Sequence, residues 1–375
     1  MKEYIAFSKA LIVNICKNEA VIIDTAKNRV FEIDSNNIEL FNKLYHGKSL
    51  DECNVEQDNE FVRKILEANL GTISASKPFN ENYDLGNTLF DVESLISVQS
   101  LYIELPFDCS KKCTLCNTNV VFGCEKCQKT KAKSFEYNLK SLKKFTCDNL
   151  SLVAGNIDTH LSELTKFLDY LQTLKPMCHK ELVCNCNSIK KLKSIQSKYN
   201  LTLVLNVCLK DIDEDFIEQL NELDMKHLKL NYMMSYEEYR DKFNDIKIHN
   251  LPYTFSIIDC KEKIDFSSFS YTLEPIYINA VRRYYTCLLS KLYIRTDGVI
   301  VPCSGLYDIV LGKINNTDIK LQKNVIRKLW ETTPVNIKGC RECAYNIICR
   351  ECRAIDYQLE NKLEEKVSCT HAGRL

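Results

Sequence analysis

Short apolar runs alternate with polar positions through the first 85 residues, with the two-residue period of half-buried strands. Residues 4–16, 20–24 and 29–34 are expected to form strands, and Lys27 and Asn28 turn the chain between the last two. Three short helices should follow. Their signals are an apolar stripe over residues 38–45 that ends at Gly47, the capping-box pair Ser49 and Glu52, and a stripe over residues 61–66 that ends near Gly71. The pattern predicts a small winged-helix-like α+β module over residues 1–85.

Beyond a polar, linker-like stretch at residues 77–82, apolar runs alternate with helical patterns. The expected strands cover residues 101–105, 150–153, 181–184, 201–207, 227–232 and 252–258. Helical spacing of apolar side chains is found between them, at residues 135–145, 161–171 and 216–223. This alternation favours parallel strands joined by helical crossovers, hence an α/β domain over residues 86–280.

The last segment, residues 281–375, begins with a predicted hairpin. Residues 291–296 and 299–301 would be its strands, and Asp297 and Gly298 a two-residue type I′ turn. The second strand leads to Cys303, and a cysteine-dense tail follows.

Fifty basic and fifty acidic residues cancel, so charge gives no reason to expect binding to nucleic acid or an anionic membrane. No apolar stretch approaches the roughly 20 residues of a membrane helix. Lys2, Glu3 and Lys9 interrupt the N-terminus, which therefore lacks a signal-peptide core. We expect a cytoplasmic protein.

Twenty cysteines in a reducing compartment indicate metal thiolates rather than disulfides. They gather at residues 109–127, 178–186 and 340–352, whereas Cys16, Cys53 and Cys147 stand alone and are interpreted as small buried apolar side chains. The lone Trp330 lies in an apolar helical stripe and is interpreted as packing, and the histidines form no metal-spaced set.

Cys109, Cys113 and Cys116 directly follow the strand predicted at residues 101–105. A cubane iron-sulfur cluster normally takes four thiolates, so three leave one iron open to a small molecule. The alternative is zinc, because Cys113 and Cys116 form one CxxC pair and Cys124 and Cys127 form another. A zinc site on these two pairs would leave Cys109 without a role.

Residues 101–109 and Leu115 resemble the opening strand and cluster loop of the radical S-adenosylmethionine (radical SAM) enzymes. The resemblance implies a partial (β/α)6 barrel, a [4Fe-4S] cluster that binds S-adenosylmethionine, and a 5′-deoxyadenosyl radical. It also implies cofactor contacts for Gly155 and Asn156, which stand where the family has Gly-Gly-Glu, and for Asn185 after the third strand. Asn156 brings no negative charge to that turn. The alternative for Asn185 is a strand end between two incidental thiols.

Seven C-terminal cysteines, together with Gly298, resemble the SPASM domain of peptide-modifying radical SAM enzymes. The resemblance implies one auxiliary [4Fe-4S] cluster on Cys340, Cys343, Cys349 and Cys369, and a second on Cys287, Cys303 and Cys352. Cys260 or a substrate group could complete the second set. One departure is the spacing of two residues, Arg350 and Glu351, where the family usually has three. Zinc is again the alternative.

The N-terminal module resembles the PqqD-like domain that recognises precursor peptides, the alternative being a winged-helix-like module with another role. The resemblances together imply a radical SAM/SPASM maturase that makes thioether or carbon-carbon cross-links in a ribosomal precursor peptide. Flavodoxin or ferredoxin would supply its electrons. No side chain is assigned a catalytic role. Two other functions stay open: maturation of a folded protein, as in sulfatase activation, and a catalytically silent iron-sulfur or zinc-binding partner.

Overall fold

The computed structural model describes most of the chain, with gaps that include the cysteine loop at residues 108–133. The described residues are 2–17, 19–79, 96–107, 134–157, 160–175, 178–185, 189–208, 212–235, 237–238, 241, 251–259, 273–315, 318–349 and 352–369.

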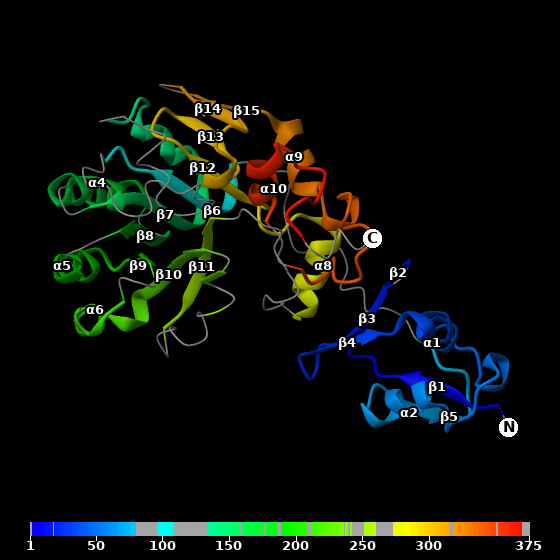
Figure 1. Ribbon diagram of the computed structural model, residues 1–375. Helices are drawn as coiled ribbons and strands as arrows, with labels where there is room; N and C mark the ends of the chain where they lie inside the picture. Colours follow the sequence, from blue (N-terminus) through cyan, green and yellow to red (C-terminus); the bar gives the residue numbers. More distant parts are fainter. Residues whose placement is uncertain are drawn as a thin grey trace.

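The N-terminal module contains two small antiparallel sheets (Figure 1). Strands β2 (Leu11–Cys16), β3 (Glu19–Asp24) and β4 (Arg29–Ile33) form one sheet, and β1 (Tyr4–Phe7) pairs with β5 (Gly71–Ser74) in the other. The single strand predicted over residues 4–16 is therefore two, because the chain turns where the Leu11 N–H donates to the Ser8 carbonyl at 3.1 Å. The strand β5 was missed. It starts at Gly71, where a Cβ would lie 2.8 Å from Cγ2 of Ile5.

Two of the three predicted helices are present, α1 (Ile38–Tyr45) and α2 (Glu60–Glu67). The second predicted helix is only a 3₁₀ turn, Asp51–Cys53, although the capping box forms and the Ser49 N–H donates to Glu52 Oε2 at 2.9 Å. The turn stops because Asn54 adopts a left-handed conformation, φ 54°. Both helices bury apolar side chains against the sheets, including Phe41, Leu44 and Ile65.

Within the described residues, ten strands form one large sheet in the order β11-β10-β9-β8-β7-β6-β12-β13-β14-β15. Its first six strands are parallel and follow chain order, as the alternating pattern predicted. They are β6 (Ser97–Glu104), β7 (Thr146–Asn156), β8 (His179–Asn185), β9 (Thr202–Cys208), β10 (Leu228–Ser235) and β11 (Tyr253–Asp259).

Three crossover helices cover one face of this sheet (Figure 1): α4 (Leu161–Leu174), α5 (Ile189–Tyr199) and α6 (Glu214–Leu220). Their apolar stripes join the main core, where Leu168 meets alternate strand residues such as Leu152 and Leu182, all fully buried. The helix predicted over residues 135–145 is only the 3₁₀ helix Leu139–Lys144. No helix of the described residues is both long and apolar enough to cross a membrane.

The C-terminal strands β12 (Lys291–Ile294), β13 (Val299–Val301), β14 (Gly312–Ile314) and β15 (Ile319–Leu321) extend the sheet, because β12 pairs parallel with β6. The predicted hairpin is β12–β13, but its turn is not type I′. Gly298 has a φ of +79°, whereas Asp297 is not among the positive-φ residues and accepts from the Val299 N–H at 3.1 Å. Three further helices of the described residues are α8 (Pro275–Arg283), α9 (Lys323–Glu331) and α10 (Arg353–Glu360). Shorter 3₁₀ turns are Ser35–Asn37, Met225–His227, Ser304–Leu306 and Pro334–Asn336.

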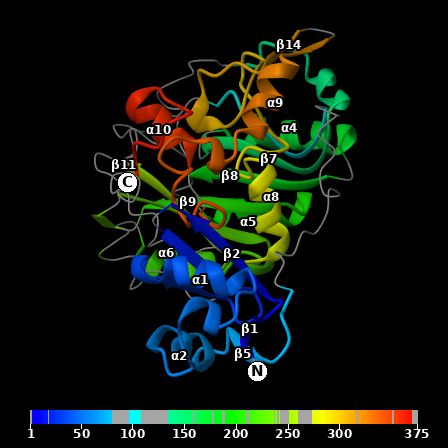
Figure 2. The ribbon, with the colours of Figure 1, turned by 90° about the vertical axis from the view of Figure 1, so that its right-hand side faces the viewer.

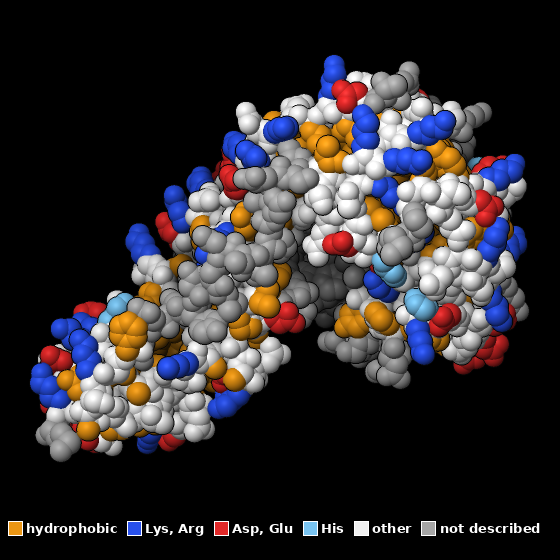
Figure 3. Space-filling view, turned by 180° about the vertical axis from the view of Figure 1, so that it is seen from behind, with side chains coloured by type: hydrophobic (Ala, Val, Ile, Leu, Met, Phe, Trp, Pro, Cys, Tyr) orange, Lys and Arg blue, Asp and Glu red, His pale blue; other side chains and the backbone are white. Residues whose placement is uncertain are grey.

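The N-terminal module packs its three-stranded sheet against the cysteine-rich C-terminal segment (Figures 1 and 2). Ile12 and Ile23 meet Ile278, Ile347 and Ile348 in a shared apolar cluster. Polar contacts surround the cluster: Asn14 Nδ2 donates to the Ala344 carbonyl at 2.7 Å, and the Ala344 N–H donates to Glu19 Oε2 at 3.2 Å. On the face seen in Figure 3, basic and acidic side chains are interspersed without a patch of one sign.

Candidate functional site

The predicted cluster ligands Cys109, Cys113 and Cys116 lie outside the described residues, as do Cys124, Cys127 and Cys260. The strand that leads to the first three is described. It is β6, which lies inside the sheet between β7 and β12, so its carboxyl end is fixed by pairing on both sides.

Glu104, the last residue of β6, is buried with 1 % of its surface exposed. Its Oε2 accepts from the Thr296 N–H and from the Tyr307 hydroxyl, each at 3.1 Å. Burial and the nearby carboxylate raise the pKa of Tyr307. Glu104 therefore anchors the C-terminal hairpin to the root of the cysteine loop. Sequence reasoning missed this residue, whose only signal was an acidic side chain inside an apolar run.

The residues predicted near the cofactor lie together at the carboxyl ends of β7 and β8. Gly155 has a φ of +66° and sits at a register shift in β7. In the β7–β8 register, Gly155 pairs with Cys184 and Asn156 with Asn185. The positive φ is a conformation that glycine adopts without strain, so this turn needs Gly155.

A row of hydrogen-bonded asparagines extends from Asn185 across the next two strands. Asn206 on β9 donates its Nδ2 to Oδ1 of Asn185 at 2.8 Å, and Asn231 on β10 donates its Nδ2 to Oδ1 of Asn206 at 2.7 Å. Asn206 and Asn231 were missed, because their spacing of 25 residues becomes a contact only when β9 and β10 pair in this register. The row fixes the Asn185 amide from one side.

The face of the sheet that bears these asparagines is opposite the crossover helices and carries both polar and apolar side chains. In β8 the buried residues alternate with partly exposed ones, so Glu181 and Asn185 share this face while Leu182 and Cys184 face the core. Glu181 accepts from Lys229 Nζ at 2.6 Å and from the Ser151 hydroxyl at 3.0 Å. Charged and amide groups held in this way suit a polar ligand.

Cys287, Cys303 and Cys352, predicted to share one auxiliary cluster, lie near one another. Cys303 follows β13 and is 3 % exposed, and Cys352 precedes α10. Burial, and next the approach of Cys287 and Cys303, raises the pKa of Cys352 well above its ordinary value. Burial raises the pKa of Cys303 to about 11, and Cys287 adds to this rise while Lys291 opposes it.

Lys291, the first residue of β12, brings a positive charge to these thiols. Burial alone would lower its pKa, but Tyr102 and the three cysteines raise it instead. Its Nζ lies 4.7 Å from the centre of the Tyr102 ring. Sequence reasoning gave Lys291 no role.

The second predicted ligand set is brought together in part. Burial raises the pKa of Cys343 to about 12, and Cys369 and Cys16 are among its further causes, so these thiols are neighbours. Cys340 lies in the same turn, where its carbonyl accepts from the Cys343 N–H at 3.0 Å. Across the described part of the chain, no group of three or more Cys, His, Asp or Glu has an arrangement ready to hold a metal ion.

Asp356 holds in place the C-terminal segment that leads to Cys369. Its carboxylate accepts from Arg353 at 2.7 Å, from Lys366 at 2.9 Å, and from the N–H groups of Val367 and Ser368 at 2.9 and 2.8 Å. Burial alone would raise the pKa of Asp356, but Lys366 and Arg353 outweigh it and hold the pKa below its usual value. This network fixes the chain just before Cys369.

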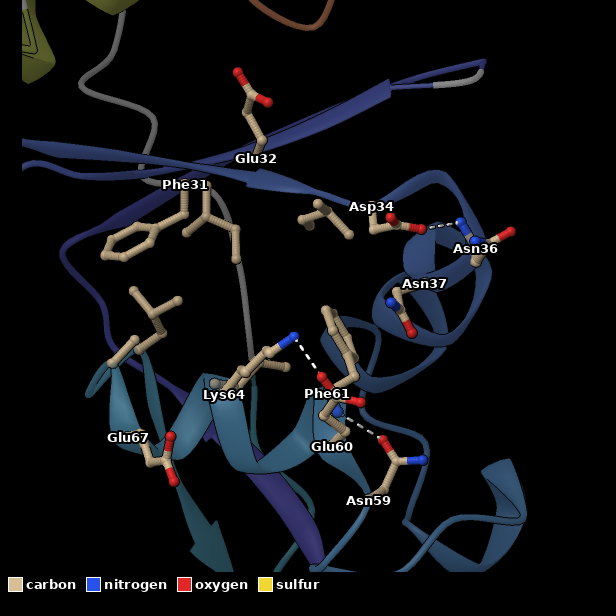
Figure 4. Close-up of a pocket in the computed structure, with 15 residues that line it drawn as sticks. Phe31, Glu32, Asp34, Asn36, Asn37, Asn59, Glu60, Phe61, Lys64 and Glu67 are labelled. Atoms are coloured by element: carbon tan, nitrogen blue, oxygen red, sulfur yellow. Dashed lines mark hydrogen bonds and ion pairs between the residues drawn. The ribbon is translucent and has the colours of Figure 1, made fainter.

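The N-terminal module has a groove of about 810 Å³ between β4 and α2 (Figure 4). Phe31 and Ile33 of β4 line it on one side, and Phe61 and Ile65 of α2 on the other. The strand β4 is an edge strand of its sheet. Figure 4 shows Glu32 pointing away from the groove, and its carboxylate accepts from the Tyr345 hydroxyl of the cysteine-rich segment.

No protein-family model matches this chain, and no curated protein matches it significantly. Among solved structures it is similar to Streptococcus suis SuiB bound to S-adenosylmethionine, with 13% identity over 98% of this chain and 100% of that one, and a TM-score of 0.39. The structure of SuiB bound to the precursor peptide SuiA matches over 98% of this chain and 100% of that one, at 13% identity and with a TM-score of 0.41.

Proposed function

We propose that this chain is a radical SAM enzyme that modifies a ribosomally made precursor peptide, introducing a thioether or carbon-carbon cross-link. The observation that carries the proposal is the position of Cys109, Cys113 and Cys116. In the sequence they directly follow β6, the first of six parallel strands in chain order, whose carboxyl end lies at the edge where α/β sheets hold their ligands.

Three thiolates at residues 109, 113 and 116 would hold a [4Fe-4S] cluster with one open iron. The bound cluster and S-adenosylmethionine would supply the 5′-deoxyadenosyl radical. The residues around them would bind and orient the S-adenosylmethionine. Gly155 lets the chain turn sharply beside the cofactor, and Asn185, held by Asn206, offers an amide to a polar group. Flavodoxin or ferredoxin would deliver the electron.

Auxiliary iron-sulfur clusters would be held by the C-terminal thiols. Cys287 contributes to raising the pKa of Cys303, and both contribute to raising the pKa of Cys352, an electrostatic repulsion that a bound cation would relieve. Lys291 adds a positive charge that suits a thiolate-ligated cluster. Cys343 and Cys369, with Cys340 and Cys349, would hold the other auxiliary cluster.

The groove between β4 and α2 would bind the leader of the precursor. An extended peptide added to the open edge of β4 gains main-chain hydrogen bonds, and apolar leader side chains would enter between Phe31 and Phe61. Binding there raises the effective concentration of the rest of the peptide at the sheet.

Anaerobic incubation with dithionite and S-adenosylmethionine tests the radical chemistry. The wild type should release 5′-deoxyadenosine, and the variant with Cys109, Cys113 and Cys116 all replaced by Ala should release none. The matched control replaces Cys124 and Cys127 by Ala, which the radical assignment tolerates and a zinc site would not. Zinc without iron in anaerobically purified protein, or turnover by the triple variant, refutes the assignment.

Peptide capture is tested on the full chain with fluorescein-labelled synthetic peptides from short reading frames beside the gene. Replacing Phe61 by Ser should weaken the binding of a captured leader at least tenfold, because Phe61 lines the groove. Arg63 is exposed on the same helix outside the groove, and Arg63→Ala should bind normally. Equal loss in both variants would contradict capture in the groove.

Co-expression of the chain with a captured peptide tests the product. Each cross-link should lower the peptide mass by two hydrogens. A maturase of folded proteins would leave every such peptide unmodified, and a silent partner would in addition form no 5′-deoxyadenosine.

A further inference from the structure

Two thiols meet at the amino ends of β7 and β8, the opposite end of the large sheet from Gly155 and Asn185. Cys147 is the second residue of β7, and Cys178 directly precedes β8, the parallel neighbour of β7. Their Sγ atoms are 3.3 Å apart, and the Cys178 thiol donates to the Cys147 carbonyl at 3.0 Å. The sequence analysis interpreted Cys147 as an isolated, buried apolar side chain, and neither Cys147 nor Cys178 is a proposed cluster ligand.

The pair is far from the proposed radical site. Cys147 and Gly155 are eight positions apart along β7, about 26 Å at the strand rise of about 3.3 Å per residue. Chemistry at this pair is therefore independent of cofactor binding at the carboxyl ends of the strands.

We propose that Cys147 and Cys178 form a dithiol-disulfide site that reacts with low-molecular-weight disulfides such as oxidised glutathione. The Cys178 thiolate attacks one sulfur of the reagent, which forms a mixed disulfide and releases one thiolate. The Cys147 sulfur then attacks the mixed disulfide at Cys178 and releases the second thiol, while the Cys147 proton passes to a released thiolate. The protein loses two electrons and two protons, and the reagent becomes two thiols.

The two cysteines differ in exposure, which assigns their order of attack. Cys178 is partly exposed and can meet a reagent from solvent, whereas Cys147 is 7 % exposed. Burial, and next the hydrogen bond with Cys178, raises the pKa of Cys147 to about 12. Cys147 is thus a poor first nucleophile, but it is held against the sulfur it must attack second.

Little movement closes the bond. The sulfurs must approach from 3.3 Å to about 2.05 Å. The β7–β8 register places Cys178 one residue along from Cys147. A strand spacing of about 4.8 Å and a rise of about 3.3 Å then give a Cα separation of about 5.8 Å, inside the range that disulfides span. The closed bond would link β7 to β8 across the crossover that contains α4.

The test treats the anaerobic full-length chain with oxidised glutathione, blocks remaining thiols with N-ethylmaleimide, and maps tryptic peptides by mass spectrometry. The expected product is one disulfide-linked species that joins residues 145–166 to residues 167–180 and disappears after dithiothreitol. Glutathione retained on Cys178, or both peptides recovered with N-ethylmaleimide, would overturn the proposal.

Single variants check the order of attack. Cys147→Ser should trap glutathione on Cys178, and Cys178→Ser should leave Cys147 unmodified. Cys53→Ser, in the N-terminal module, is the control and should form the linked peptides like the wild type. The peptide map of the wild type tests the proposal even if a variant fails to fold. Its result does not depend on whether the chain makes a radical.

Discussion

At the scale of single residues, the most consequential side chains are buried ions that tie distant segments together. Glu104 and Asp356 are each almost inaccessible to solvent and accept several hydrogen bonds from segments far from them or across a turn. A buried carboxylate is tolerated only when donors replace its water, so both positions depend on partners that the sequence does not reveal.

Replacing Glu104 by Ala should lower the free energy of unfolding by about 2–4 kcal/mol, because the Thr296 N–H and the Tyr307 hydroxyl lose their buried acceptor. Denaturant titration followed by circular dichroism measures the loss. Glu104→Gln keeps the shape of the side chain and one acceptor oxygen, so it should lower the free energy of unfolding by less than Glu104→Ala. Equal stability of Glu104→Ala and wild type would show that the contact contributes nothing.

Asp356 makes the C-terminal segment sensitive to acid. Its folded pKa lies below the unfolded value of about 3.9, so its stabilisation is complete above that value and is lost as the pH falls through the folded pKa. Asp356→Asn should lose about 3–5 kcal/mol at neutral pH, since Arg353 and Lys366 keep buried charges without a counter-ion.

Fluorescence of Trp330 measures this effect, because it is the one tryptophan of the chain and its carbonyl accepts from the Tyr285 N–H in the same segment. The wild type should become less stable below about pH 4, and the variant should show a flatter profile there. Parallel pH profiles would contradict this assignment.

At the scale of elements, the strand β3 has two apolar faces with different partners. Ile22 packs in the core of the N-terminal module, and Ile23 packs against the C-terminal segment. Uninterrupted apolar positions in residues 20–23 were consistent with a strand, but only the tertiary structure distinguishes the module core from the interface.

Neighbouring alanine variants should separate the two faces. Both Ile22→Ala and Ile23→Ala remove buried methyl groups, at about 2–5 kcal/mol each. Ile23→Ala should make residues 340–349 more susceptible to limited proteolysis while the module stays folded, and Ile22→Ala should expose the module first. Identical cleavage patterns in the two variants would rule out a separate interface.

At the scale of the whole molecule, β4 connects the proposed leader groove to the cysteine-rich segment. Phe31 faces the groove, and Glu32, on the opposite face, accepts from Tyr345, which lies between Cys343 and Cys349 (Figure 4). A peptide that adds to the edge of β4 therefore orders a strand already bonded to the C-terminal segment.

Leader binding should slow amide hydrogen exchange at residues 340–349 as well as in β4 and α2. Tyr345→Phe removes the hydroxyl that joins the two parts, so it should keep the protection at the groove and reduce the distant protection. Protection confined to residues 29–68 in the wild type would mean that the groove and the cysteine-rich segment act separately.

The sequence by itself determined the elements whose signals are local. The period of apolar positions predicted α1, α2, α4, α6 and the six parallel strands, because burial of one face imposes that period on any helix or strand. The resemblance to the SPASM domain implied a shared cluster on Cys287, Cys303 and Cys352, which stays a prediction. Signals that depend on one backbone angle were less reliable: the turn at Asp297 and the short turn at residues 51–53 differ from prediction.

Only the tertiary structure decided the contacts between segments distant in sequence. The asparagine row, the Cys147–Cys178 pair, the burial of Glu104 and the docking of the N-terminal module each require a specific register or packing of separate elements. Apolar periodicity states which face is buried but not against what, since the hydrophobic effect has no direction. Long-range partners are chosen by shape and hydrogen bonding, which exist only once the chain is folded.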